Sequence, residues 1–68
     1  METSARNQLR GTVTNVSIGA VMAEVTLDVG GAQMVAAITK ESAERLGLTQ
    51  GKQATAIIKA TDVMIGVD

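Results

Sequence analysis

The sequence contains no cysteine, histidine, proline or aromatic residue in its 68 positions. Without thiols or imidazoles, it has no disulfide, no ordinary zinc site and no cysteine or histidine nucleophile. Without aromatic rings, it lacks the base-stacking surface of common single-strand nucleic-acid-binding proteins. Six basic and seven acidic residues leave a net charge of −1, so the chain has no basic excess to attract phosphate backbones. We therefore predict no nucleic-acid partner.

The composition that remains is typical of a small folded domain. Hydrophobic residues make up 46% of the chain and charged residues 19%, a balance that argues against disorder. The length allows one domain, residues 1–68. A domain of this size buries only about 60% of its unfolded surface, and the large area that aromatic rings normally bury is missing. We therefore expect the chain to associate with copies of itself.

Two further absences concern location. The chain starts Met-Glu-Thr-Ser, which is neither basic nor apolar, so no signal peptide is visible. Its apolar runs are far shorter than the ~20 residues that cross a bilayer. We expect a soluble cytoplasmic protein without a membrane partner.

Alternation of apolar and polar residues predicts strands in the first half of the chain. In residues 8–18 the apolar positions change phase by one near residues 14–15, which predicts a β-bulge. Residues 21–29 alternate without interruption, as in a half-buried antiparallel strand. Gly30 and Gly31 then predict a two-residue hairpin turn, because both can adopt a positive φ.

The next segment predicts a strand followed by a short helix. The strand at residues 32–38 is apolar on both faces apart from Gln33, so we expect a partner subunit to cover its second face. Thr39 is the expected N-cap of a helix over residues 40–46, and Gly47 is expected to end it.

Two final strands are expected at residues 53–59 and 61–67, joined by a tight connection. The order strand, strand, strand, helix, strand, strand predicts an all-β fold, a small five-stranded OB-like Greek-key barrel with one short helix at an end.

The chain offers little for catalysis. Glu24 and Asp28 lie on the polar face of one predicted strand, about 13 Å apart by strand rise, which is farther than a paired-carboxylate glycosidase site allows. Ser4, Ser17 and Ser42 have no histidine that could act as their base. We predict that the protein is not an enzyme.

Basic and hydroxyl residues point to a small anion instead. Lys59 interrupts the apolar run 54–60, where a buried ammonium would need an anion; otherwise it ends a strand with its ammonium in water. Thr39 at a helix start either binds an anion with the nearby N–H groups or acts only as an N-cap. With Ser4 and Arg6, and without carboxylates, these groups have the donor chemistry of an oxyanion site.

Three segments resemble the molbindins, the small Mop-type proteins of the TOBE/molybdate-binding domain family. They are SARNQL from Ser4, AAITKESAERLGLTQG from Ala36 and ATAIIKATDVMI up to Ile65. The resemblance extends from Ser4 to Val67, and the three segments at this spacing are specific. It implies an OB-like barrel whose subunits exchange a strand to form dimers, three of which assemble into a homohexamer.

The resemblance also implies a site for molybdate, or its analogue tungstate, at subunit interfaces. The residues that match the family's site are Ser4, Ala5, Arg6, Thr39, Lys59 and Ala60. Regulator-type domains of the family often have serine where this chain has Ala60, so one hydroxyl contact is missing and the backbone N–H remains. Hydrogen bonds and two cations would hold the oxyanion, without direct side-chain bonds to the metal.

We predict a non-enzymatic protein that binds molybdate or tungstate for intracellular molybdenum storage and homeostasis. Two alternatives stay open. One is a molybdate-sensing module that acts on a protein partner. The other is a molybdopterin-binding protein, as an older family name implies, although a pterin favours an aromatic or deep apolar pocket and the chain has no aromatic side chain.

Overall fold

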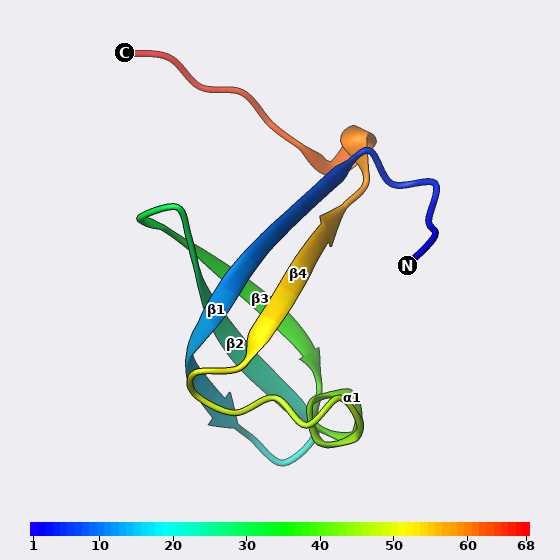
Figure 1. The fold of residues 1–68 in the computed structure, drawn as a ribbon, viewed down its shortest axis with the longest axis vertical. Helices are drawn as coiled ribbons and strands as arrows, with labels where there is room; N and C mark the ends of the chain where they lie inside the picture. The colour runs from blue at the N-terminus through cyan, green and yellow to red at the C-terminus, as the bar shows by residue number, and fades with distance from the viewer.

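The computed structural model describes residues 1–68 as a four-stranded antiparallel sheet with one short α-helix (Figure 1). The elements in chain order are β1 (Asn7–Ile18), β2 (Met22–Val29), β3 (Ala32–Thr39), α1 (Lys40–Arg45), β4 (Gln53–Ile58) and the 3-10 turn η1 (Ala60–Asp62). The spatial order β3-β2-β1-β4 places the fourth strand beside the first, which confirms the predicted Greek-key arrangement. No helix is long and apolar enough to cross a membrane.

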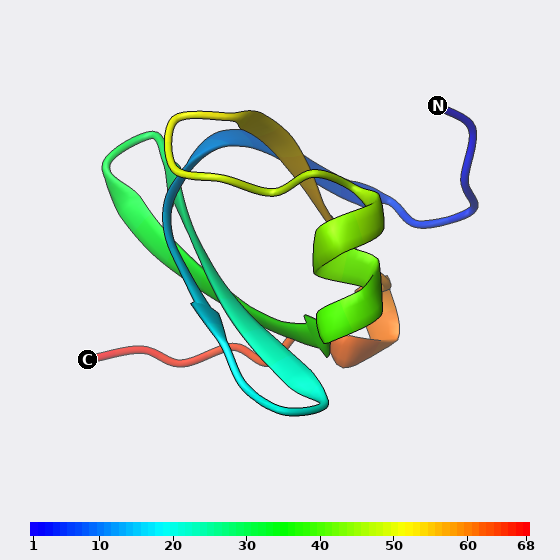
Figure 2. The same cartoon turned by 90° about the horizontal axis from the view of Figure 1, so that it is seen from below.

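The long strand β1 connects the two halves of the sheet. Its first part pairs with β4 and its second part with β2, and the register shifts between Val13 and Asn15, which confirms the predicted bulge. Beside the bulge, Gly11 is buried, and a Cβ there would lie 2.5 Å from the carbonyl oxygen of Asp28. Only glycine permits this close approach, and the sheet curls strongly around its buried face (Figure 2).

The turn from β2 to β3 is the predicted glycine pair. Gly30 and Gly31 adopt φ values of 58° and 89°, and the N–H of Gly31 donates a hydrogen bond to Asp28 Oδ1 at 3.0 Å. This geometry is typical of a tight hairpin connection. It confirms the register in which Val29 lies opposite Ala32.

Helix α1 begins where the sequence predicted. Thr39 is its N-cap, and Thr39 Oγ1 accepts a hydrogen bond from the N–H of Ser42 at 3.1 Å. The helix ends at Arg45, one residue before the predicted end. Lys52 Nζ donates to the carbonyl oxygen of Leu46 at 2.7 Å and satisfies an acceptor that a helix end leaves free.

The hydrophobic core is small. Only Val13, Ala23, Val25, Leu27 and Ala43 are buried apolar residues. Val35, on the opposite face of β3, is 61% exposed, as expected for a strand that is apolar on both faces. The single chain therefore leaves apolar surface uncovered.

The prediction of a fifth strand at residues 61–67 is wrong for the single chain. Residues 60–62 form η1, and residues 63–68 adopt no regular structure. They project away from the sheet as an extended tail (Figure 1). The physical reason is that a strand needs a neighbour, and the turn at η1 directs the tail away from both edge strands. The sheet therefore remains open between β3 and β4 instead of closing into a five-stranded barrel.

Candidate functional site

The predicted site residues fall into two groups at opposite ends of the molecule. Residues 4–6 precede β1 and residues 59–60 follow β4. Asn7 pairs with Ile58 across these strands, and Asn7 Nδ2 donates to the Ile58 carbonyl oxygen at 3.3 Å. The two segments are therefore neighbours, and we call residues 4–6 with residues 59–62 the Arg6–Lys59 end.

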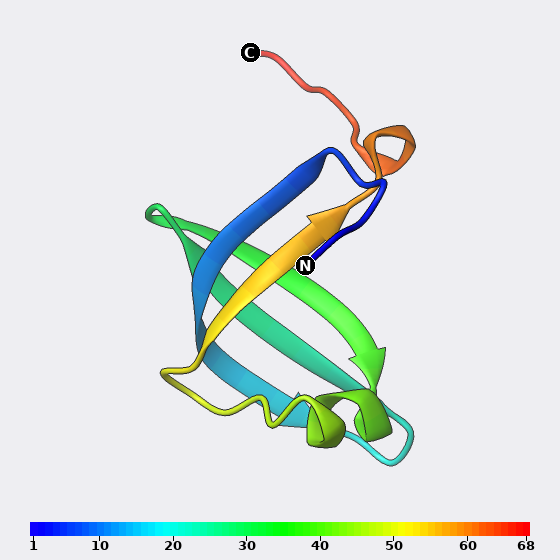
Figure 3. The same cartoon turned by 45° about the vertical axis from the view of Figure 1, so that its right-hand side comes forward.

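Thr39 lies at the other end, where β3 meets α1 (Figures 1 and 3). It pairs with Met22 at the start of β2, and the N–H of Lys40 donates to the carbonyl oxygen of Val21 at 2.7 Å. We call residues 39–44, together with the β1–β2 turn at residues 19–21, the Thr39 end. Because the length of the sheet separates the two ends, one chain does not bring all six predicted residues together.

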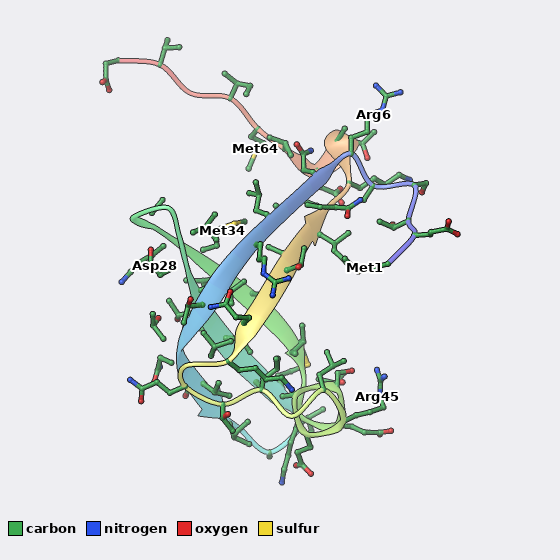
Figure 4. The ribbon with its side chains drawn as sticks, in the orientation of Figure 1. Met1, Arg6, Asp28, Met34, Arg45 and Met64 are labelled. Carbon is green, nitrogen blue, oxygen red and sulfur yellow. The ribbon has the colours of Figure 1, made fainter.

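The Arg6–Lys59 end carries two cations, Arg6 and Lys59, and one carboxylate, Asp62, with no ion pair between them. Arg6 and Lys59 are both exposed, and the one ion pair of the structure joins Lys40 Nζ to Glu44 Oε1, at 3.9 Å. Figure 4 shows the Arg6 side chain directed outward beside η1. Both cations are therefore free to bind an anion from outside the chain.

Backbone donors accompany these cations. Ala60 opens η1, and Lys59 provides no side-chain cap for the turn, so the first N–H groups of the turn have no acceptor within it. On the N-terminal side, Ser4 is exposed and Ala5 is half-buried. Hydroxyl, N–H, guanidinium and ammonium donors thus lie at one end, as a small oxyanion site requires.

The Thr39 end contains a hydroxyl pair that the sequence reasoning missed. Thr39 Oγ1 donates to Ser42 Oγ at 2.8 Å while accepting from the Ser42 N–H. In the sequence, Ser42 is only a serine without a histidine base. Its position three residues after the N-cap was the available signal, because side chains at these two positions face each other across the first helical turn.

The charge around this hydroxyl pair differs from that at the opposite end. A cavity of about 370 Å³ beside Thr39 is also lined by Ala20, Val21, Lys40, Glu41 and Glu44. Two carboxylates and one lysine give these surroundings a net negative charge. A doubly charged anion bound here needs cations from elsewhere, and another copy of the chain has them at its Arg6–Lys59 end.

A third feature is an apolar groove of about 300 Å³ over the opening between the edge strands β3 and β4. Its walls are Val25, Leu27, Met34, Val35, Ala36, Ile38, Leu46, Leu48, Ala54, Thr55, Ala56, Ile57 and Ile58. All of these except Thr55 are apolar. The outer edges of both strands face this opening without a strand partner.

Comparison with known proteins shows the family of the chain. Residues 3–65 match the TOBE domain, and 50% of 66 aligned residues are identical to molybdenum-pterin-binding protein 3 of Clostridium pasteurianum, over 96% of this chain and 97% of that protein. The chain belongs to the Mop-type family of molybdenum-binding TOBE proteins. The relatives in this family are named as molybdenum-pterin-binding or molybdate-binding proteins, which agrees with the prediction of a non-enzymatic binding protein.

Solved Mop-type structures share the fold closely. A molybdate-binding protein from Sporomusa ovata superposes with a TM-score of 0.94 at 40% identity, over 98% of this chain and all of that one. The cytoplasmic molybdate-binding protein ModG, in a form with molybdate bound, gives a TM-score of 0.94 at 48% identity. The whole of this chain matches 49% of the ModG chain.

Proposed function

We propose that the protein binds molybdate, or tungstate as its analogue, between the subunits of a homo-oligomer and serves as a cytoplasmic store of molybdenum. The observation that supports this most strongly is the separation of the site residues. The cationic donors and the hydroxyl pair lie at opposite ends of one chain, so only a second chain can join them. ModG, with a closely similar fold, has molybdate bound.

In the proposed site the anion lies between the Arg6–Lys59 end of one subunit and the Thr39 end of another. Arg6 and Lys59 offset its two negative charges, and Arg6 presents several N–H donors in a fixed plane. The hydroxyls of Ser4 and Thr39 and the N–H groups of Ala5 and Ala60 bind the oxygen atoms. In this structure the Thr39 hydroxyl donates its one proton to Ser42 Oγ, so binding requires that proton to rotate toward the anion, while Thr39 Oγ1 still accepts from the N–H of Ser42. The absence of a hydroxyl at Ala60 leaves its N–H as the donor there.

Assembly follows from the tail and the groove. Met64, Ile65 and Val67 are 92%, 87% and 93% exposed, and Figure 4 shows Met64 on the tail away from the sheet. An extended apolar segment can add to the free edge of a sheet through main-chain hydrogen bonds. We infer that the tail of one subunit enters the groove of another and supplies the fifth strand. Exchange in both directions gives a dimer, and three dimers give the homohexamer.

Two alternatives make different predictions. A sensing module would bind molybdate and then bind a protein partner that a pull-down identifies. A molybdopterin-binding protein would take up the pterin, as the name of the Clostridium relative suggests. The groove that could accept a pterin has no aromatic wall, and the exchanged tail would fill it.

Calorimetric titration with sodium molybdate tests the proposal, with sodium sulfate as the competing anion. Wild-type protein should bind molybdate in a fixed ratio per subunit and bind sulfate far more weakly, because we expect the pocket to suit the larger anion. Molybdopterin should not compete. No saturable molybdate binding, or equal binding of sulfate, would refute the proposed function.

A further inference from the structure

Thr3 directly precedes the candidate site and already contacts one of its donors. Its Oγ1 accepts a hydrogen bond from the N–H of Ala5 at 3.2 Å. The same N–H is one of the groups that the proposed function assigns to the oxyanion. Since an N–H group has a single proton to donate, the Thr3 hydroxyl and an oxyanion oxygen compete for it.

The carbonyl group of Ala5 has a hydrogen-bond partner of its own. Gln8 Nε2 donates to the Ala5 carbonyl oxygen at 3.2 Å. Ala5 is half-buried, whereas Thr3 and Gln8 are exposed. The Ala5 N–H can therefore exchange the Thr3 oxygen for an anion oxygen by rotation of the Thr3 side chain, while Gln8 keeps the Ala5 carbonyl group in place.

We propose that Thr3 is a positioning residue that weakens the binding of the oxyanion by occupying the Ala5 N–H. The inference rests on the proposed function, because it concerns the affinity of that site. Each binding event must break the Thr3–Ala5 hydrogen bond, and each release re-forms it. A protein that stores an anion and later releases it benefits from such an internal competitor.

Two variants test this. Thr3→Val keeps the shape of the side chain and removes the acceptor, and Thr3→Ser keeps the hydroxyl. In calorimetric titrations with sodium molybdate, Thr3→Val should bind about two- to tenfold more tightly than wild type, the range expected for one net hydrogen bond. Thr3→Ser should bind like wild type.

A spectroscopic measurement identifies the donor. In ¹⁵N-labelled protein without molybdate, the Ala5 amide proton should shift upfield in Thr3→Val and keep its position in Thr3→Ser. A structural effect of the substitution elsewhere would not produce this paired result.

The outcomes separate this inference from the proposed function. Unchanged or weaker molybdate binding by Thr3→Val would overturn the inference while leaving the proposed function intact, and weaker binding would mean that the Thr3 hydroxyl itself donates to the anion. Failure of the wild-type protein to bind molybdate at all would refute the proposed function and, with it, the inference.

Discussion

The two ends of the sheet differ in charge, in donor type and in local structure. The Arg6–Lys59 end is formed by chain segments outside the strands and carries free cations. The Thr39 end is formed by a capped helix and carries hydroxyls beside Glu41 and Glu44. Neither end alone has both the charge and the geometry that a tetrahedral dianion requires. In the proposed site the two halves therefore come from different chains, and binding requires assembly.

The largest effect is expected from removing the tail that we propose joins one subunit to another. Deletion of residues 63–68 should abolish both assembly and molybdate binding, because the groove loses the apolar segment that we propose fills it. Light scattering after size-exclusion chromatography and calorimetry measure the two properties. Deletion of Asp68 alone is the matched control. A truncated chain that keeps the full-length mass and binds molybdate would show that the tail is not the connection.

Loss of charge at the Arg6–Lys59 end should have the next largest effect. Arg6→Ala or Lys59→Ala should weaken molybdate binding by about 10- to 100-fold, since each removes a charge-assisted contact, while the oligomer persists. Arg45→Ala removes an exposed arginine at the helix end and should bind normally. If both site variants bound like wild type, the assignment of this end would be wrong.

Loss of the hydroxyl at the Thr39 end should have a smaller effect on binding. Thr39→Val should weaken molybdate binding about three- to tenfold, as expected for a neutral hydrogen bond, and should lower the free energy of unfolding by about 1 kcal/mol through loss of the N-cap. Thr39→Ser keeps the hydroxyl, so both molybdate binding and the N-cap should be retained. Calorimetry and denaturant unfolding measure the two effects, and a stability loss without any change in binding would leave Thr39 as an N-cap only.

The smallest expected change in molybdate affinity tests the difference in charge between the two ends of the sheet. Glu41→Gln removes a carboxylate beside Thr39 and should strengthen molybdate binding by about twofold at low salt, with less effect at high salt because surface charges are screened. Asp28→Asn, at the β2–β3 turn, removes an equal charge and keeps the acceptor for Gly31. It should leave binding unchanged. Equal gains in both variants would mean that net charge, and not the Thr39 end, determines the effect.

Much of the fold follows from local patterns in the sequence. The phase change near residues 14–15, the glycine pair and the Thr39 cap are each determined by residues close together in the chain, and the structure confirms all three. The fifth strand could not be predicted in the same way. Residues 61–67 alternate like a strand, but a strand forms only against a neighbour, and the single chain provides none in reach.

The sequence suggests which donors could form the candidate site but not how they are arranged. The donor types and the resemblance pointed to Arg6, Lys59 and Thr39, yet nothing in the sequence places Thr39 at the opposite end of the sheet. Their separation depends on the length and register of β1, which are tertiary properties. Ser42 was missed because its contact with Thr39 requires the helix to be capped at that residue.

The central claim, that each site combines two chains, is tested most directly by mixing two defective variants. Arg6→Ala/Lys59→Ala lacks the cationic half. Thr39→Asp keeps an N-cap but repels the anion at the other half. Neither variant should bind molybdate alone. Co-expressed in equal amounts, they should regain about a quarter of the wild-type sites by calorimetry, since random assembly in a symmetric oligomer pairs the two intact halves at that frequency. If the mixture binds no molybdate, the site does not combine halves from two chains, and the account is wrong.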